Sequence, residues 1–196
     1  MKNVLNPNVV LASATIFGIV LLSGLSAGAQ MKPSREEFQA QAMGQGTQLG
    51  KNANVTLIIN EYSPLSDRQI LVDAFKAAGN EGLVNALSKM SAKGRLMITG
   101  TLGYDVDYIR SFPTPNGRKI RLVTGRPIRL GELWTDSRST DYELSALEFD
   151  LSDQKGKSTG TLLPACQFQI GKDGEVELLN LRNPWSLVNI LDRTKK

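Results

Sequence analysis

The chain has 196 residues, with 23 basic side chains against 19 acidic ones, one cysteine and no histidine. Without imidazole, Ser-His-Asp and Cys-His nucleophile systems, histidine metal ligands and histidine general bases are excluded. The formal net charge of +4 favours solubility but does not identify a nucleic-acid-binding protein.

Residues 1–29 have the composition of an export signal. Lys2 supplies a short positive start, and residues 9–25 carry no charge. Ala27 and Ala29 then stand at the positions that a signal peptidase recognises. An uncleaved anchor is the alternative, because the apolar run approaches the roughly 20 residues that span a bilayer. We expect cleavage, and therefore a secreted or periplasmic bacterial protein that keeps no transmembrane domain.

Residues 30–54 are rich in Gln, Gly, Ala and Lys and show little apolar periodicity. We therefore predict a flexible linker here, with a short helix near residues 35–42. A single globular domain is expected over residues 55–192, beginning with the β-branched strand 55–59. The chain that remains after cleavage at residue 29 is long enough to bury about 70% of the surface that it exposes when unfolded, so it needs neither a metal nor a disulfide.

Two helices are predicted after this first strand. Ser66 has the position of an N-cap, and Gln69 completes a capping box with it. Apolar residues at helical spacing follow, and Gly79 is expected to end the first helix. Asn80 then caps a second helix that reaches Met90. The pair is expected to cover one face of a sheet.

From residue 95 onward the pattern is almost entirely that of β-strands. Asn116-Gly117 is the strongest hairpin signal, and Asp173-Gly174 marks another hairpin. The expected strands are 95–99, 104–112, 119–124, 141–151, 159–170, 176–181 and 186–191. Strands that come in runs, rather than alternating with helices, indicate the α+β class. We predict an N-terminal helical pair packed on a mostly antiparallel sheet of about six to eight strands, with a curled or barrel-like form left open.

Two short motifs resemble nucleophile sites but lack their context. Residues 156–160 match the G-x-S-x-G elbow, which needs a strand-to-helix turn and a histidine. Residues 152–155 match S-x-x-K, but a lysine at a polar hairpin tip is expected to be solvated and charged. Both segments are predicted to be turns. The glycine-rich run 44–51 has the spacing of neither a phosphate loop nor a dinucleotide fingerprint, so no cofactor is predicted.

Carboxylates provide the alternative route to catalysis. Asp105 and Asp107 form a D-x-D pair, but no segment has the spacing of a calcium loop, and no metal site is predicted. We expect a solvated strand face, with Asp107 opposite Arg126 across the hairpin. A glycosidase-like hydrolase would instead need two carboxyl groups about 5–9.5 Å apart in a cleft. Its candidates are Asp105, Asp107, Glu132, Asp141, Glu143 and Glu148.

The most suggestive cluster is basic. Its members fall between residues 110 and 129 with no acid among them, and aromatic residues lie close by in the sequence. Arginines and aromatic rings together on a β-hairpin suit a polyanion, a carboxylated glycan or an acidic partner. Strand alternation is nevertheless expected to divide these charges between two faces. The cluster consists of Arg110, Arg118, Lys119, Arg121, Arg126 and Arg129, with Tyr104, Tyr108, Phe112 and Trp134 as aromatic neighbours.

Most of the chain after residue 55 also carries a resemblance to a known family. The residues that carry it are the helix start 66–73, the segment 80–83, the strings 116–122 and 124–128, Tyr142, Glu148 and the turn 156–160. In these features the chain resembles a family of uncharacterised exported proteins from environmental bacteria. The shared motifs are turns and strand ends, so the resemblance implies no activity and assigns no functional residue.

We therefore expect an exported, non-enzymatic binding or interaction module that uses the basic-aromatic hairpin. Its partner would be an anionic macromolecule or an envelope component. A carboxylate-dependent hydrolase is one alternative, and a structural envelope component that self-associates is another. Cys166 lies in an apolar stretch and is expected to be a buried thiol.

Overall fold

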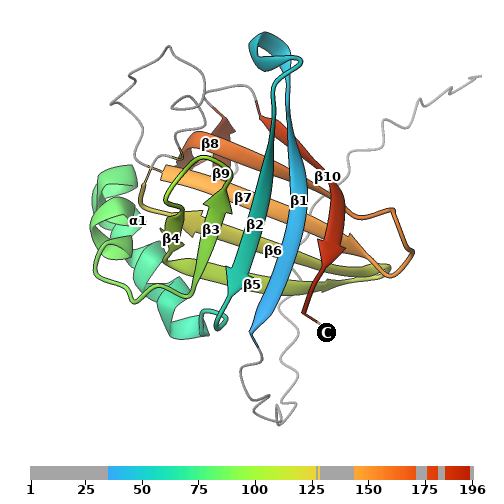
Figure 1. Ribbon diagram of the computed structural model, residues 1–196. Helices are drawn as coiled ribbons and strands as arrows, with labels where there is room; N and C mark the ends of the chain where they lie inside the picture. The colour runs from blue at the N-terminus through green and yellow to red at the C-terminus, as the bar shows by residue number, and fades with distance from the viewer. Residues whose placement is uncertain (1–34, 127, 129–143, 171–175, 181–183, 195–196) are drawn as a thin grey trace, which may run out of the picture. The chain divides into compact units, whose positions relative to one another are not determined.

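A computed structural model of the protein describes residues 35–126, 128, 144–170, 176–180 and 184–194 (Figure 1). The predicted export signal, residues 1–29, lies outside this part of the chain. None of the helices in the described ranges is long and apolar enough to cross a bilayer.

Within the described ranges, ten antiparallel strands form one sheet in the order β4-β3-β2-β1-β10-β8-β7-β6-β5, with β9 added beside β8. The strands are β1 (Glu36–Gly44), β2 (Asn52–Ile59), β3 (Gly94–Ile98), β4 (Tyr104–Val106), β5 (Tyr108–Thr114), β6 (Gly117–Thr124), β7 (Leu144–Ser152), β8 (Thr159–Ile170), β9 (Val176–Asn180) and β10 (Trp185–Asp192). The helices are η1 (Gly46–Gln48) and α1 (Leu65–Leu87).

The sheet curls into a nearly closed barrel because the strands at its two ends are consecutive in the chain. Only Asp107 separates β4 from β5. Residues 104–106 pair with β3, and residues 108–114 pair with β6. A stretch of chain that changes its pairing partner at one residue brings the two ends of the sheet together.

The predicted N-terminal helical pair on a smaller sheet is wrong. The described part of the chain has one α-helix, α1, and it follows β1 and β2. A break does occur at the predicted place, because Ala78 and Gly79 leave helical geometry, with a φ of 59° at Gly79. It lies inside α1, whose N-cap is Pro64 rather than Ser66. The antiparallel pairing of the strands agrees with the prediction.

The flexible linker predicted for residues 30–54 is also wrong where the structure describes it, because this segment contains β1 and the start of β2. Phe38, Ala40 and Ala42 point inward and are buried, while the residues between them point outward. Alanine, glutamine and glutamate favour helices in isolation, which explains the short helix expected at residues 35–42. Pairing with β2 and β10 on either side overrides that preference.

Apolar side chains fill the barrel interior. Trp185, which is 2% exposed, lies on β10 opposite Gly44, where β1 presents no side chain. The rings of Phe38 and Phe149 lie with their centroids 5.9 Å apart. This core includes Val55, Leu57, Leu96, Ile98, Ile109, Ile120, Leu122, Leu147, Leu162 and Leu187. Burial of this apolar surface is the main force that favours the curled sheet.

A second apolar cluster joins α1 to the strands around Cys166. It contains Leu71, Leu83, Leu87, Leu144, Leu163 and Cys166. Leu163 alternates with the inward-facing Leu162, so α1 covers the outer face of the sheet here. The predicted burial of Cys166 is confirmed. Burial raises the pKa of its thiol to about 12, which keeps the sulfur protonated and unreactive.

The hairpin between β5 and β6 turns one residue earlier than predicted. Thr114 pairs with Gly117, so residues 115–116 rather than 116–117 form the loop. Gly117 has a φ of 144°, and a Cβ at this position would lie 2.0 Å from a backbone oxygen of β7. Glycine is therefore required as the first residue of β6 rather than inside the turn.

The seam between β4 and β5 is sealed by residues that follow β2. The backbone N–H of Ser63 donates to the carbonyl of Ile109 at 2.8 Å. In return, the Ser63 hydroxyl accepts from the Ile109 N–H at 3.0 Å. Next to it, the N–H groups of residues 60–61 donate to the carbonyl of Lys93. This segment thus satisfies backbone groups that a neighbouring strand would otherwise pair.

Replacing Ser63 by alanine tests this seal. Ser63 is 6% exposed, so Ser63→Ala leaves the Ile109 N–H buried without its acceptor and should lower the free energy of unfolding by about 1–3 kcal/mol. Ser66→Ala is the matched control and should change it by less than about 0.5 kcal/mol, because Ser66 does not cap the helix. Urea denaturation measures both. Equal effects of the two substitutions would contradict the seal.

Candidate ligand-binding groove

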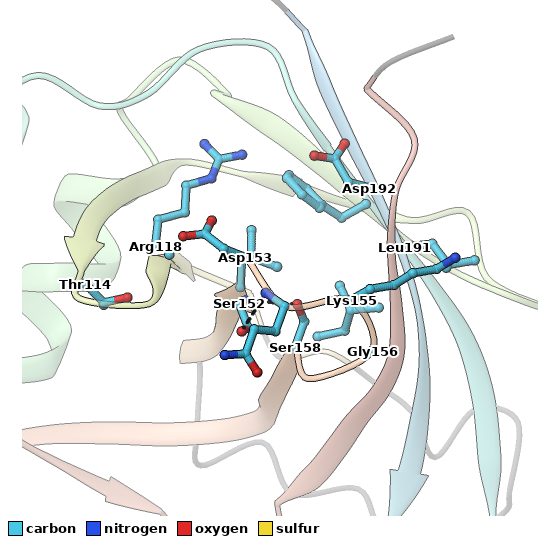
Figure 2. Close-up of a pocket in the computed structure, with 14 residues that line it drawn as sticks. Thr114, Arg118, Ser152, Asp153, Lys155, Gly156, Ser158, Leu191 and Asp192 are labelled. Atoms are coloured by element: carbon cyan, nitrogen blue, oxygen red, sulfur yellow. Dashed lines mark hydrogen bonds between the residues drawn. The ribbon is translucent and has the colours of Figure 1, made fainter.

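A groove of about 520 Å³ opens at one end of the barrel, and Figure 2 shows the side chains that line it. It is formed where β5, β7 and β10 end and where β6 begins, with the β7–β8 hairpin as one wall. Its lining residues are Phe38, Thr114, Gly117, Arg118, Leu151, Ser152, Asp153, Gln154, Lys155, Gly156, Ser158, Ile190, Leu191 and Asp192. Its volume is in the range of small-ligand sites.

Arg118 closes the barrel interior beside this groove. Its guanidinium lies over the ring of Phe38, 5.6 Å from the centroid. It forms a two-pronged ion pair with Glu36 and donates to the hydroxyl of Tyr62 at 3.2 Å. Burial, and then the negative charge of Glu36, raises the pKa of Tyr62 well above its ordinary value. The phenol therefore stays neutral, and Glu36 compensates the charge of Arg118.

The rest of the groove combines an apolar floor with a larger polar and charged rim. Leu151 and Ile190 pack against the barrel core, and Leu191 is 49% exposed. Asp153, Lys155 and Asp192 supply the charges of the rim. With Arg118 compensated by Glu36, two aspartates against one lysine leave this rim negative. The surface suits a ligand with an apolar body and a cationic group.

Residues 152–158, which contain the whole S-x-x-K motif and the first part of the G-x-S-x-G motif, form the hairpin between β7 and β8, as predicted. The Ser158 hydroxyl accepts from the N–H of Ser152 at 3.0 Å, and the Ser152 hydroxyl accepts from the N–H of Gln154 at 3.1 Å. Both hydroxyls thus hold the loop in shape. They define one wall of the groove rather than a nucleophile.

The six predicted basic residues do not form one surface. Arg118 points into the barrel end, whereas Lys119 and Arg121 point outward on the same strand. Arg126 contributes a backbone carbonyl, which accepts from the Ser145 hydroxyl at 2.9 Å. Arg129 lies outside the described residues. Strand alternation therefore divides the cluster.

On the outer face, acids of β7 neutralise most of the basic charge. Glu148 binds Arg121 and lies 3.0 Å from the Lys119 Nζ, and Asp150 lies 3.3 Å from the same nitrogen. Although burial raises the pKa of Glu148, these two cations outweigh it, and the pKa falls below its ordinary value. Such alternating ion pairs between neighbouring strands are typical of a stabilised sheet surface rather than of a site that binds a polyanion.

The aromatic neighbours are divided as well. Phe112 lies outward, with the guanidiniums of Arg110 and Arg121 5.3 and 5.5 Å from its ring centroid. Tyr104 packs against the barrel core, and Tyr108 packs against the cluster beneath α1. Trp134 lies outside the described residues. The described aromatic rings therefore serve mainly packing.

The candidate carboxylates of a hydrolase are engaged elsewhere. Asp105 forms an ion pair of 2.6 Å with Arg95. Asp107 accepts from the N–H of Gly125 at 3.3 Å, and Arg126, its predicted partner across the hairpin, lies near enough for its positive charge to act on this carboxylate. Burial raises the pKa of Asp107, although the hydrogen bond from Gly125 opposes the shift. Neither these two acids nor Glu148 lines the groove.

Glu132, Asp141 and Glu143, the other candidate carboxylates, lie outside the described residues. Among the residues that are described, no group of three or more Cys, Asp and Glu side chains is placed to hold a metal ion.

No sequence pattern identifies Glu36, Tyr62 or Asp192 as a site residue. Glu36 and Arg118 are 82 positions apart, and no spacing pattern links them. Tyr62 follows a predicted strand, but its place beside the barrel end depends on the closure of the sheet.

Comparison of the chain with protein-family models, curated proteins and solved structures finds no match.

A pair of arginine substitutions tests the different roles of β6 side chains. Arg118→Met leaves Glu36, whose side chain is 13% exposed, without its ion-pair partner and should cost about 1–3 kcal/mol of unfolding free energy. Arg121→Met should cost less than about 1 kcal/mol, because the Arg121 side chain is 58% exposed and Glu148 keeps Lys119. Urea denaturation at neutral pH measures the difference. A larger loss for Arg121→Met would refute the assignment.

Proposed function

We propose that this chain is an exported, non-catalytic binding module, secreted or periplasmic, that holds an amphipathic ligand in the barrel-end groove. The main observation that supports this proposal is a groove of about 520 Å³ with an apolar floor and a negatively charged rim. Side chains fill the barrel interior, so the barrel end offers a ligand more space than the core does. The apolar part of the ligand lies on the floor, and its cationic group lies near the rim.

Two observations favour binding over hydrolysis. The described candidate carboxylates are held in ion pairs or by backbone hydrogen bonds away from the groove. The serine hydroxyls within the groove accept hydrogen bonds from their own hairpin. A hydrolase would need a positioned acid and base that face a common ligand.

The basic-aromatic hairpin supports a polyanionic partner less well than expected. Lys119 and Arg121 already share acids of β7, which lowers the net charge of the outer face. The rim of the groove is negative and would repel a polyanion. These charges favour a cationic amphiphile as the ligand.

The test compares two probes of equal tail length, decyltrimethylammonium and decyl sulfate, each below its micelle concentration. Titration of the ¹⁵N-labelled full chain should shift the amide signals of residues 151–158 and 190–192 with the cationic probe, and the anionic probe should bind more weakly. Asp192→Asn keeps an oxygen for the N–H of Thr194 but removes the rim charge. It should weaken binding of the cationic probe by up to about fivefold.

Glu81→Gln is the matched control, because Glu81 is an exposed acid on α1, away from the groove-lining residues. It should leave the affinity unchanged. The proposal fails if neither probe moves the groove signals, or if Glu81→Gln weakens binding as much as Asp192→Asn does.

A further inference from the structure

A second groove, of about 500 Å³, crosses the outer face of β2, β1 and β10. These three strands lie side by side in Figure 1. The side chains that line the groove are mostly amides: Gln39, Gln41, Asn54, Thr56, Asn189 and Leu191. None of them carries a formal charge, and this sets the face apart from the barrel-end groove.

A β-bulge shapes the centre of this surface. Gln39 pairs with Leu191 and Gln41 pairs with Val188, so β10 contains one more residue than β1 between the same pairs. Asn189 lies in the bulge with a φ of 53°, in the left-handed region that few residues other than glycine adopt. Bulges of this kind redirect side chains, often next to functional sites. Here the bulge places the Asn189 amide beside Gln41.

The amide groups retain most of their hydrogen-bonding capacity. The Asn189 amide donates to the Gln41 side-chain oxygen across 3.4 Å, a long contact. Within the described part of the chain, the Asn54 and Thr56 side chains have no hydrogen-bond partner in the protein. Each amide offers two donors and an acceptor oxygen with two lone pairs. The face therefore presents donors and acceptors together, on neighbouring strands about 4.8 Å apart.

Side chains, rather than backbone, must make the contacts on this face. β1 pairs with β2 on one side and with β10 on the other, and β2 pairs with β3 as well. An added peptide strand therefore finds no free edge at the centre of the groove. Gln39 has charged hydrogen-bond partners, since it accepts from Arg193 at 3.2 Å and donates to Glu37 at 3.4 Å. Gln41 and Asn189 are instead hydrogen-bonded to each other.

We propose that this face binds an uncharged glycan chain. Neighbouring sugar hydroxyls each donate and accept, as the amides of Gln41, Asn54 and Asn189 do, so the two surfaces match without any charged group. Leu191, 49% exposed at the edge of the groove, offers apolar contact to the C–H face of a sugar ring. Unlike those of the barrel-end groove, the residues that line this groove carry no formal charge. Leu191 lines both grooves, but the amides lie outside the barrel-end groove, so this proposal does not rest on the function proposed above.

The test uses the ¹⁵N-labelled full chain and three neutral hexasaccharides: cellohexaose, maltohexaose and fully N-acetylated chitohexaose. At least one of them should cause saturable shifts in the side-chain amide signals of Gln41, Asn54 and Asn189 at millimolar concentration. Asn189→Gly removes the amide but tolerates the positive φ, so the bulge is retained. It should weaken binding about fivefold, and Gln41→Ala should do the same.

Gln154→Ala is the control, because Gln154 is an exposed amide in the other groove. It should leave glycan affinity unchanged, and decyltrimethylammonium should not shift the Gln41, Asn54 and Asn189 signals. The proposal is overturned if none of the hexasaccharides shifts these signals. It is also overturned if an uncharged Gly-Ser peptide shifts them while the glycans do not, or if Asn189→Gly and Gln154→Ala have equal effects.

Discussion

The fold depends on one constraint. The sheet can bury its apolar face only if the segment from Tyr104 to Thr114 pairs with the strands at both ends of the sheet. This stretch pairs first with β3 and then with β6, changing partner at Asp107. The hydroxyl of Thr124 on β6 donates to the carbonyl of Asp105 at 3.1 Å, which ties the two ends together. Ser63 then satisfies the backbone of β5 at the seam. Without this closure, the inner face of the strands would meet water.

Closure also decides where the two proposed ligands would have to bind. A barrel interior filled by side chains confines recognition to its ends and outer faces. At the end where Arg118 meets Glu36, the groove gains a charged rim over an apolar floor. On the outer face of β1 and its neighbours, a bulge at Asn189 arranges uncharged amides instead. The two surfaces therefore suit different ligands: an amphiphile with a cationic group and a neutral glycan.

Local patterns predicted the later strands well, because runs of apolar and β-branched residues between turn signals specify them. β8 has the predicted limits, and β10 differs by one residue at each end. β1 was missed because three of its four buried positions are small, Ala40, Ala42 and Gly44, and its strand structure comes from pairing with β2 and β10. The ion pair of Glu36 and Arg118 joins residues 82 positions apart, and no local pattern encodes it. The alternation of side chains along a strand did predict that the basic cluster would be divided between the two faces of the sheet.

Native-state hydrogen exchange at the seam tests the central claim most directly. If Ser63 and Ile109 seal the barrel, the Ile109 amide should exchange only through global unfolding, with the same opening free energy as the Leu122 amide of β6. The Ser63→Ala variant should accelerate exchange at Ile109 more than at Leu122. Exchange at Ile109 in the unaltered protein that is orders of magnitude faster than at Leu122 would show that the seam opens by itself. That result would contradict the account.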